Sequence, residues 1–427
     1  MKLAEAALGQ ARVAATPTPA LAYGLLGLPL AFGALPIYVH VPRYYAEVAG
    51  MELAVLGAIL LATRLIDAGI DPWLGQLADR MPRPRLLAFA LLPFVFGFVA
   101  LLHPPAGVDS LFWLLGSLLL TCTGYSAATI AYQAWGADLG ADAGERTRLT
   151  AWREGCTLAG VILAAALPGL LAPTPTPTPT PTAGIRLLAW VLPVLLLVAI
   201  VGAFSRLGSG RPSASLSPQG GRVRDALADP AFRRLLLVFL ANGIAAAIPA
   251  TLFLFYVEDV LHAASAAPGL LVLYFACAAL SLPLWLRVVA RHGRVVAWFG
   301  AMLLALAAFA AALLLGPGDV LAFGAVCALT GIALGADLSL PAAIAADLGE
   351  RRGQAGACFG LWNFIAKLNL ALATGLALPL LGLLGYTPGQ AGVPTALIIA
   401  YAGLPLVFKT LAAVLLWRWQ AYLEIRP

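Results

Sequence analysis

Two acidic residues lie inside the second apolar stretch of the chain, where charged side chains are costly. Asp67 and Asp71 are four residues apart, and Arg64 precedes Asp67 by three. On a helix that turns by about 100° per residue, all three side chains share one face. Two carboxylates in a low-dielectric medium need a proton, a metal cation or a fixed cationic side chain between them. The spacing therefore predicts a cation- or proton-binding site, and a closed ion-pair cluster with Arg64 is the structural alternative.

A basic residue lies equally deep in the eleventh apolar stretch. Lys367 is flanked on both sides by apolar-biased sequence, which is too long for its side chain to reach the membrane surface comfortably. We expect Lys367 to pair with the two acids and to compete for them with Na⁺ or H⁺. Lys409, in the twelfth stretch, is interpreted as structural.

The composition indicates which classes of protein are excluded. Of 427 residues, 61% are hydrophobic and only 11% are charged, whereas soluble domains carry about 25% charged residues. A soluble enzyme, a nucleic-acid-binding domain and a disordered protein are therefore excluded. The sequence contains no HExxH, GxSxG or phosphate-loop motif, so no enzyme is predicted. The five cysteines show no CxxC spacing and support neither a disulfide framework nor a zinc site.

The hydropathy pattern predicts an all-α membrane protein with twelve transmembrane helices arranged as two six-helix bundles. The first bundle is expected in residues 1–205 and the second in residues 235–427, and a polar, Gly- and Ser-containing linker of residues 206–234 joins them. The expected spans are residues 22–41, 53–74, 86–102, 111–135, 149–171, 185–204, 235–257, 268–289, 295–315, 320–346, 356–384 and 395–417.

The distribution of basic residues predicts the orientation. Lys and Arg gather in the loops that share a side with the amino terminus, the linker and the carboxyl terminus. By the positive-inside rule both termini and the linker are cytoplasmic, in a plasma (inner) membrane protein. Residues 1–19 do not read as a cleavable signal. The alternating Pro-Thr run at residues 173–182 is expected to form a polyproline-II stalk outside the membrane.

Several motifs carry a resemblance to a known family. Residues 75–85 (GQLADRMPRPR) resemble the loop between helices two and three of the major facilitator superfamily. Residues 64–75 (RLIDAGIDPWLG) are similar to the glycoside–pentoside–hexuronide:cation symporter family, the melibiose-carrier-like branch. Residues 44–50, 130–139, 145–154 and 362–367 agree with the same family, so the resemblance extends over nearly the whole chain.

The resemblance implies two bundles around a central cavity that opens alternately to the two sides. It assigns cation binding to Asp67 and Asp71 and places Lys367 near them, with Ser126 where a fourth-helix Thr is usual. Ile70 stands where Na⁺-using members often have Asn, which favours H⁺ over Na⁺ because a hard oxygen ligand is lost. Both ions stay open. Galactoside-using members have acids where this chain has Ala31 and Thr129, so a galactoside is disfavoured.

Further polar and aromatic residues are candidates for the substrate cavity or for a cytoplasmic gate. Aromatic rings and fixed polar groups suit sugars, although each aromatic residue also fits a packing role, and Arg153 also fits a cytoplasmic charge like its neighbours. The cavity candidates are Tyr38, Thr129, Tyr132, Gln133, Arg153, Asn242, Asp337, Trp362 and Asn363. The gate candidates are Asp79, Arg80, Glu145, Arg146 and Arg148.

These observations predict a monomeric, cation-coupled symporter of a small polar solute, a sugar or glycoside, that needs no cofactor besides its coupling ion. The alternative is a carrier of an amphipathic or lysolipid-like solute, because a eukaryotic branch resembling this family moves lysolipids. A transport-dead sensor is the third reading. The three intramembrane charges argue against it, because such charges are expensive unless they serve transport.

Overall fold

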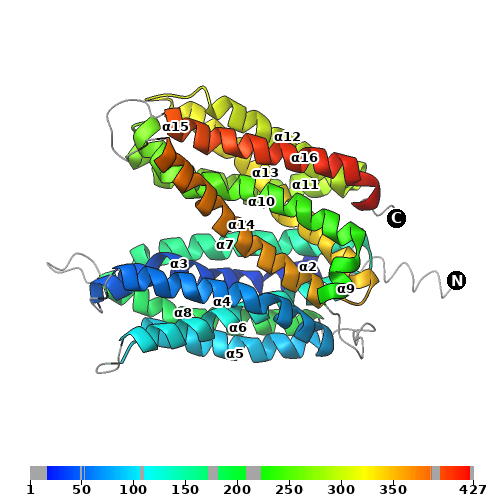
Figure 1. Cartoon of the computed structure of the whole chain (residues 1–427). Coiled ribbons are helices and arrows are strands. Elements are labelled where there is room, and N and C mark those ends of the chain that lie inside the picture. Colours follow the sequence, from blue (N-terminus) through cyan, green and yellow to red (C-terminus); the bar gives the residue numbers. More distant parts are fainter. Residues whose placement is uncertain are drawn as a thin grey trace. The chain divides into compact units, whose positions relative to one another are not determined.

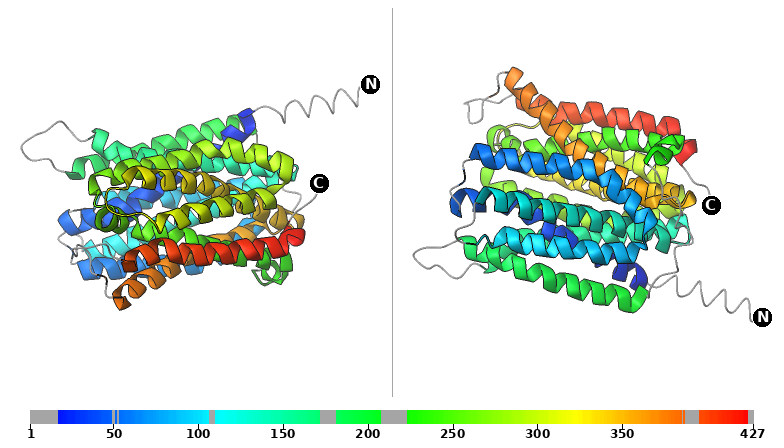
Figure 2. Two further views of the ribbon diagram at one scale, coloured as in Figure 1. Left: turned by 90° about the horizontal axis from the view of Figure 1, so that it is seen from above. Right: turned by 60° about the horizontal axis from the view of Figure 1, so that its bottom comes forward.

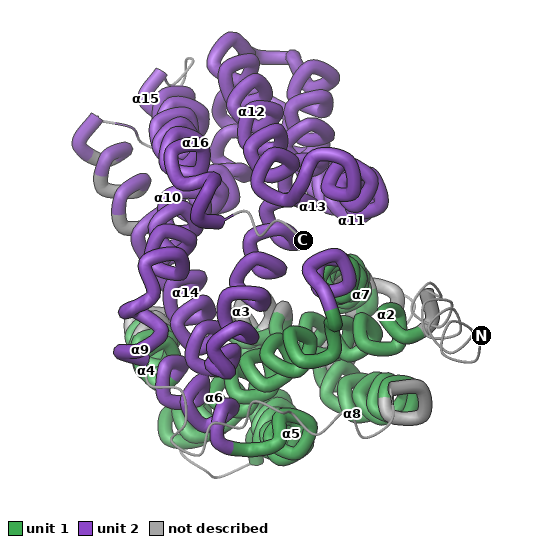
Figure 3. The backbone as a smooth tube through the Cα atoms, turned by 90° about the vertical axis from the view of Figure 1, so that its right-hand side faces the viewer, with its two compact units in different colours: residues 1–70, 81–141, 148–216 green, residues 71–80, 142–147, 217–427 purple. Residues whose placement is uncertain are grey.

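The computed structural model describes residues 17–48, 51, 53–105, 110–171, 181–207, 223–384, 386 and 395–423 (Figure 1). Within these ranges every regular element is a helix. The chain divides into two compact units, coloured separately in Figure 3. Unit 1 comprises residues 1–70, 81–141 and 148–216, and unit 2 comprises residues 71–80, 142–147 and 217–427. Two short segments from the first half of the sequence therefore belong to unit 2.

Unit 1 is a bundle of long helices in which α5 and α6 form the most extensive contact. Its helices are α2 (Pro17–Gly24), α3 (Gly27–Val48), α4 (Leu53–Arg80, up to residue 70), α5 (Arg83–Leu102), α6 (Ser110–Leu139), α7 (Ala143–Leu171, from residue 148) and α8 (Pro181–Leu207). Helix α5 packs on α6 and on α8, and these helices run lengthwise in the right-hand view of Figure 2. A Cβ at Gly124 of α6 would come within 2.8 Å of the Phe94 Cα, so the close approach of α5 and α6 requires glycine there.

Unit 2 contains the second set of helices. These are α9 (Val223–Ala228), α10 (Pro230–Phe255), η1 (Tyr256–Val260), η2 (Ala264–Ala266), α11 (Ala267–His292), α12 (Arg294–Ala312), α13 (Val320–Arg351), α14 (Ala355–Leu383), α15 (Thr395–Ile398), η3 (Ile399–Gly403) and α16 (Leu404–Leu423). Helix α10 packs on α14 and α16, and α13 packs on α11 and α12. Asp229 caps α10 by accepting a hydrogen bond from the Ala231 amide at 2.9 Å, ahead of Pro230 in the first turn.

Two short π-helical turns, η1 and η3, interrupt the regular helices of unit 2. Their aromatic residues stack, with the ring centroids of Tyr256 and Tyr401 4.1 Å apart. The Tyr256 hydroxyl donates a hydrogen bond to the Ala312 carbonyl at 2.6 Å, which ties η1 to the end of α12. Such π turns redirect side chains and are frequent at functional sites. Here they turn Tyr401 toward the interior of unit 2.

Nine helical segments among the described residues are long and apolar enough to cross a membrane. The other three expected spans coincide with the helices α3, α4 and α7. Helix α4 carries Arg64, Asp67 and Asp71 in its sequence. The twelve-span count therefore stays a prediction.

Three expectations fall partly outside the described residues. Of the linker, residues 208–222 lie outside; α9 occupies Val223–Ala228 and α10 begins at Pro230, earlier than expected. Of the Pro-Thr run, residues 173–180 lie outside, and Pro181 and Thr182 belong to α8 rather than to a stalk. A proline is tolerated in the first turn of a helix because the amide hydrogen it lacks has no acceptor there. Residues 1–16 also lie outside the described ranges.

Candidate functional site

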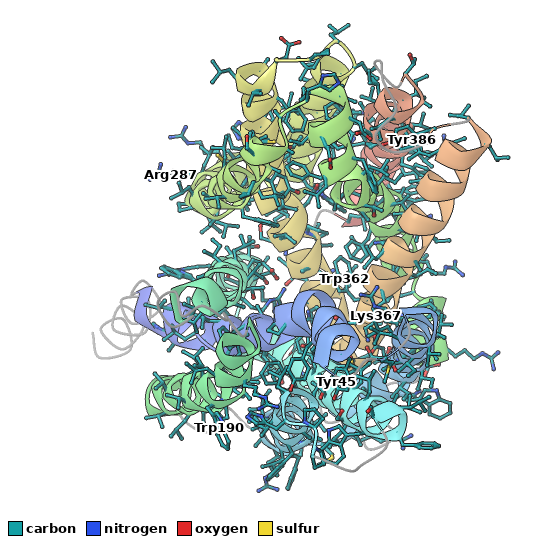
Figure 4. The ribbon with its side chains drawn as sticks, turned by 90° about the vertical axis from the view of Figure 1, so that its left-hand side faces the viewer. Tyr45, Trp190, Arg287, Trp362, Lys367 and Tyr386 are labelled. Carbon is teal, nitrogen blue, oxygen red and sulfur yellow. The ribbon has the colours of Figure 1, made fainter. Side chains whose placement is uncertain are left out.

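An ion pair with a buried carboxylate joins the second half of α4 to the middle of α14. The Lys367 Nζ lies 2.7 Å from an Asp71 carboxylate oxygen, as the sequence predicts. The Asp71 side chain is fully buried, whereas 26% of the Lys367 side chain is exposed. Figure 4 labels Lys367 on α14, one and a half turns beyond Trp362. The pair is therefore open to its surroundings on the lysine side only.

Glycines let the backbones of α4 and α14 approach closely beside this pair. A Cβ at Gly360 would lie 2.6 Å from the Asp71 carbonyl oxygen and 3.0 Å from the Gly75 Cα. A Cβ at Gly75 would in turn lie 2.9 Å from the Gly360 Cα. Small residues allow such close contact between helices in a membrane, where packing replaces the hydrophobic effect as the driving force. This contact sets the position of Asp71 against α14.

Where α4 contacts the start of α14, a carboxylate of α4 caps α14. Asp79, fully buried, accepts hydrogen bonds from the backbone amides of Gly356 at 2.7 Å and Ala357 at 2.8 Å. These amides belong to the first turn of α14, which offers unpaired donors and a partial positive charge. Two contacts thus hold residues 71–80 of α4 to α14: Asp79 binds the first turn of α14, and Asp71 binds Lys367 near the middle of α14. The two segments run antiparallel.

The second acid of α4 has a different partner, within unit 1. Asp67 is 5% exposed and accepts a hydrogen bond from the Ser126 hydroxyl of α6 at 2.8 Å. The sequence predicts this association, because both residues are assigned to one cation site. The Arg64 side chain is exposed, although it lies one turn before Asp67 on the same helix. Each acid on α4 therefore has its own described neighbour: a hydroxyl for Asp67 and an ammonium for Asp71.

Among the residues expected at the gate, Arg146 pairs with an acid that the sequence analysis did not name. Arg146 pairs with Asp347 of α13 at 2.8 Å, and Arg294 of α12 pairs with the other oxygen of the same carboxylate. Asp347 is 1% exposed, so two guanidinium groups neutralise one buried acid. In contrast, Arg80 is exposed, and Glu145 and Arg148 are partly buried. The contacts of Asp79 with the amides of α14 were not predicted.

A signal in the sequence could have revealed Asp347 and Arg294. The motif Ala-Asp-Leu-Gly occurs at residues 137–140 and again at residues 346–349. In unit 1, Arg83 at the start of α5 pairs with Asp138 and donates to the Ala134 carbonyl at 3.1 Å. In unit 2, Arg294 at the start of α12 pairs with Asp347 and donates to the Ala343 carbonyl at 3.3 Å. The same arrangement, an arginine that pairs with an acid and donates to a backbone carbonyl, thus occurs once in each unit, and the repeated motif contains the acid in both.

Two of the cavity candidates in unit 1 are committed to neighbours. The Tyr132 hydroxyl donates to the Tyr23 carbonyl at 2.6 Å, and the Tyr23 hydroxyl donates to the Tyr132 carbonyl at 3.0 Å. This reciprocal pair corresponds to the packing alternative for Tyr132. Arg153 is 4% exposed and donates to Glu154 at 2.6 and 3.0 Å. The alternative for Arg153 was a cytoplasmic charge like its neighbours. Such a charge is expected to be exposed to solvent, whereas the Arg153 side chain is buried.

The remaining cavity candidates lie on α3, α6, α10 and α14 and differ in burial and in contacts. Trp362 stacks on Phe239 with ring centroids 3.6 Å apart, and Asn363 donates to the Phe359 carbonyl at 2.8 Å. Asn242 is 3% exposed, and its carbonyl oxygen receives no hydrogen bond from the described residues. Thr129 and Gln133 are partly buried on α6. Tyr38 belongs to α3, but its side chain lies outside the described set.

Asp337 has a partner that the sequence reasoning did not assign to it. The Lys409 Nζ lies 2.5 Å from one carboxylate oxygen, and the Trp298 indole nitrogen donates to the other at 2.8 Å. Both members of the ion pair are buried, with 8% of the Asp337 side chain and 3% of the Lys409 side chain exposed. This pair connects α13 with α16 inside unit 2.

Comparison with known proteins places this arrangement in a family. The family described as MFS/sugar transport protein matches residues 18–421, nearly the whole chain. The chain belongs to this family. It is thus an MFS protein and an integral, polytopic membrane protein, and its predicted resemblance to sugar and glycoside carriers of this superfamily is confirmed by the family match and by a putative glycoside/cation symporter among its relatives.

Two curated relatives resemble only part of the MFS chain. A putative glycoside/cation symporter, YagG of Escherichia coli, is 29% identical over 143 residues, covering 30% of this chain and 29% of that protein. An uncharacterized symporter, YjmB of Bacillus subtilis, is 26% identical over 125 residues, covering 27% of each chain. The matched segments therefore span less than a third of either relative.

Solved structures share the MFS fold along nearly the whole chain. A bacterial homologue of the iron transporter ferroportin has a TM-score of 0.69 at 18% identity, covering 95% of this chain and 100% of that one. The E. coli fucose:proton symporter FucP has a TM-score of 0.67 at 14% identity, covering 91% and 97%. The human organic anion transporter MFSD10 has a TM-score of 0.62 at 18% identity, covering 97% and 99%. At these identities the likeness concerns the fold alone.

Proposed function

We propose that this chain is a secondary symporter that couples the inward movement of H⁺ or Na⁺ to uptake of a small polar solute, a sugar or glycoside. It would act in the plasma (inner) membrane with both termini in the cytoplasm. The observation that carries the proposal is the ion pair between Asp71 and Lys367, with its fully buried carboxylate. Intramembrane charges of this kind mark ion pathways, because packing alone would not retain them.

The two acids of α4 give the ion a place to act. Asp67 and Asp71 are one helical turn apart; Asp71 pairs with the Lys367 ammonium, and Asp67 accepts from the Ser126 hydroxyl. A proton on Asp67, or a Na⁺ held by Asp67 and the Ser126 hydroxyl, would remove the negative charge one turn before Asp71 on α4 and so change how strongly Asp71 holds its charge for Lys367. Ion binding would thereby change the strength of the contact between α4 and α14. This dependence is the basis of coupling.

The contacts of residues 71–80 and 142–147 supply the conformational element. Asp79 on the first turn of α14 and Arg146 on Asp347 hold these segments to unit 2. Breaking both sets would release the cytoplasmic end of α4 from α14, and remaking them would close that end again. Such a switch between discrete packings is how small changes at a site produce large movements. The ion and the solute would together set which packing is favoured.

The experiment that tests the proposal is uptake into vesicles that contain the full chain. A panel of radiolabelled sugars and glycosides is offered with a Na⁺ gradient, with a pH gradient and with neither. We expect one gradient to drive accumulation of at least one sugar or glycoside above its outside concentration. We expect Asp67→Asn and Asp71→Asn each to abolish that accumulation while the protein stays folded.

The matched control is Asp319→Asn. Asp319 is also an acid of this chain, but it lies in the turn before α13 and accepts a hydrogen bond from the Gly316 amide. We expect this variant to accumulate the sugar normally. Undiminished accumulation in both Asp67→Asn and Asp71→Asn would refute the coupling role. Gradient-driven accumulation of a lysolipid, with no sugar transported, would change the proposed solute to a lysolipid and leave the proposed coupling in place.

A further inference from the structure

A cavity inside unit 2 is separate from the residues of the proposed coupling site. It has a volume of about 280 Å³, and α10, α11, α12, α13, η3 and α16 all contribute to its walls. Neither Asp71 nor Lys367 is among its lining residues. The walls are mainly apolar and aromatic, with Phe253, Phe275 and Phe309 among them. Cavities of this character, with a few polar groups at one place, are the usual form of small-molecule sites.

The polar part of the cavity contains the buried ion pair of Asp337 and Lys409, and both residues line it. Both oxygens of Asp337 are engaged, one by Lys409 and one by the Trp298 indole. The Lys409 ammonium has three N–H donors, and Asp337 is its one hydrogen-bond partner among the described residues. An ammonium on a side chain that is only 3% exposed, with donors to spare, favours an additional oxygen acceptor.

Two phenols extend this polar part. Tyr274 of α11 and Tyr401 of η3 line the cavity, and within the described chain neither hydroxyl takes part in a hydrogen bond. The π-helical turn η3 is what directs Tyr401 there. The spare N–H donors of Lys409 and the two phenol O–H groups thus lie beside one carboxylate, each of whose oxygens already accepts a hydrogen bond. This balance selects an acceptor-rich ligand group, and a carboxylate is the strongest match for an ammonium.

We propose that this cavity binds a small amphipathic carboxylate, with the acid on Lys409 and an aryl-sized apolar body against the phenylalanines. The volume lies near the lower end of the usual range of about 300–1,000 Å³ for ligand pockets, so a lysolipid does not fit. A sugar would leave many hydroxyls without partners against the apolar wall. The site is independent of the proposed coupling site and adds a second ligand class to this chain.

Binding of a carboxylate brings a second negative charge to Lys409. Two carboxylates around one ammonium carry a net charge of −1, which a low-dielectric site disfavours. We therefore expect one proton to enter from solvent with the ligand and to be shared between the ligand carboxylate and Asp337. The other titratable groups in the lining, Tyr274, Tyr401 and Cys327, are neutral near pH 7 and supply no second negative charge.

The test is equilibrium dialysis of radiolabelled phenylacetate against the purified full chain in detergent. We expect saturable binding that phenylacetate displaces but the neutral phenylacetamide and the cationic phenethylamine displace at least about tenfold less well. We also expect a pH indicator to register uptake of one proton per ligand bound. Equal displacement by phenylacetamide, preference for phenethylamine, or absence of saturable binding would overturn the proposal, and binding without proton uptake would overturn its protonation step.

Two variants locate the binding. The double variant Asp337→Asn/Lys409→Gln keeps the site neutral and keeps an acceptor for Trp298; we expect its affinity for phenylacetate to fall at least about tenfold. Ala246→Phe fills the cavity from α10 without touching the ion pair and serves if the double variant does not fold. Asp71→Asn should bind phenylacetate as the unaltered chain does, whatever becomes of its transport. Unchanged binding in Ala246→Phe would overturn the assignment.

Discussion

Removing one partner at a time from the pair of Asp71 and Lys367 should have unequal consequences. Lys367→Met strands a carboxylate whose side chain is fully buried, and breaking a buried pair in this way costs about 3–5 kcal/mol. Asp71→Asn strands an ammonium whose side chain is 26% exposed. Coupling requires that a mobile ion reach this pair, so we expect the exposed part of Lys367 to face water. Contact with water lowers the destabilisation caused by Asp71→Asn to about 1–3 kcal/mol. The lysine variant should therefore be the less stable of the two.

The double variant Asp71→Asn/Lys367→Met separates the effect of charge from that of packing, because it removes both charges at once. We expect it to be more stable than Lys367→Met alone by at least about 1 kcal/mol, and yet to be uncoupled. The assay is denaturant unfolding of the purified full chain in detergent, followed by tryptophan fluorescence.

The matched control is the pair of Asp337 and Lys409, of which both side chains are nearly buried. There Asp337→Asn and Lys409→Met should differ less than the two variants at the first pair do. If Asp71→Asn destabilises the chain as much as Lys367→Met or more, Lys367 has no access to water, and the reasoning about the pair fails.

Three further perturbations address the neighbouring contacts. Ser126→Ala removes a ligand oxygen and a donor to Asp67. In uptake titrations it should therefore raise the half-saturating Na⁺ concentration if Na⁺ drives transport, or lower the half-saturating H⁺ concentration if H⁺ does, by about tenfold. Ser117→Ala removes a hydroxyl elsewhere on α6, one that bonds carbonyls of its own helix and Tyr45, and should leave both values unchanged; an unaffected Ser126→Ala would remove Ser126 from the site. Gly75→Val should separate α4 from α14 and abolish uptake, whereas Gly69→Val on the same helix meets open space and should transport; equal activity of the two would contradict the close-contact argument. Asp79→Ala should destabilise the capped form by about 1–2 kcal/mol and increase labelling of a cysteine introduced in α14 near Gly356, and unchanged labelling would show that the cap does not hold the segment.

The sequence was most informative where a residue type conflicts with its surroundings. Asp67, Asp71 and Lys367 are charges within apolar stretches, and such charges must find partners. That requirement alone predicted that Lys367 would contact an acid of the second helix, and the 2.7 Å pair confirms this contact. It did not predict which acid, because the choice depends on how far residues 71–80 extend along α14. The coupling role of these residues stays a prediction.

Contacts set by tertiary packing were harder to predict. Asp79 was expected in the ion pairs of a gate, and the sequence did not predict that it caps α14, where the glycines of α4 and α14 bring backbone amides within its reach. Lys409 and Asp337 were assessed separately, one as structural and one as a cavity residue, although they form a pair. They lie on different helices, and only the packing of α16 on α10 and α12 brings Lys409 to Asp337.

The central claim is that solute and ion cross the membrane together through the site at Asp71 and Lys367. The most direct measurement uses proteoliposomes that contain the full chain, with neither a Na⁺ nor a pH gradient at the start. An inward gradient of the transported sugar is imposed, and the movement of ²²Na⁺ and of protons is followed. We predict that one of the two ions enters with the sugar in a fixed ratio, and that Asp71→Asn stops the ion movement. Entry of the sugar with neither ion moving would contradict the account.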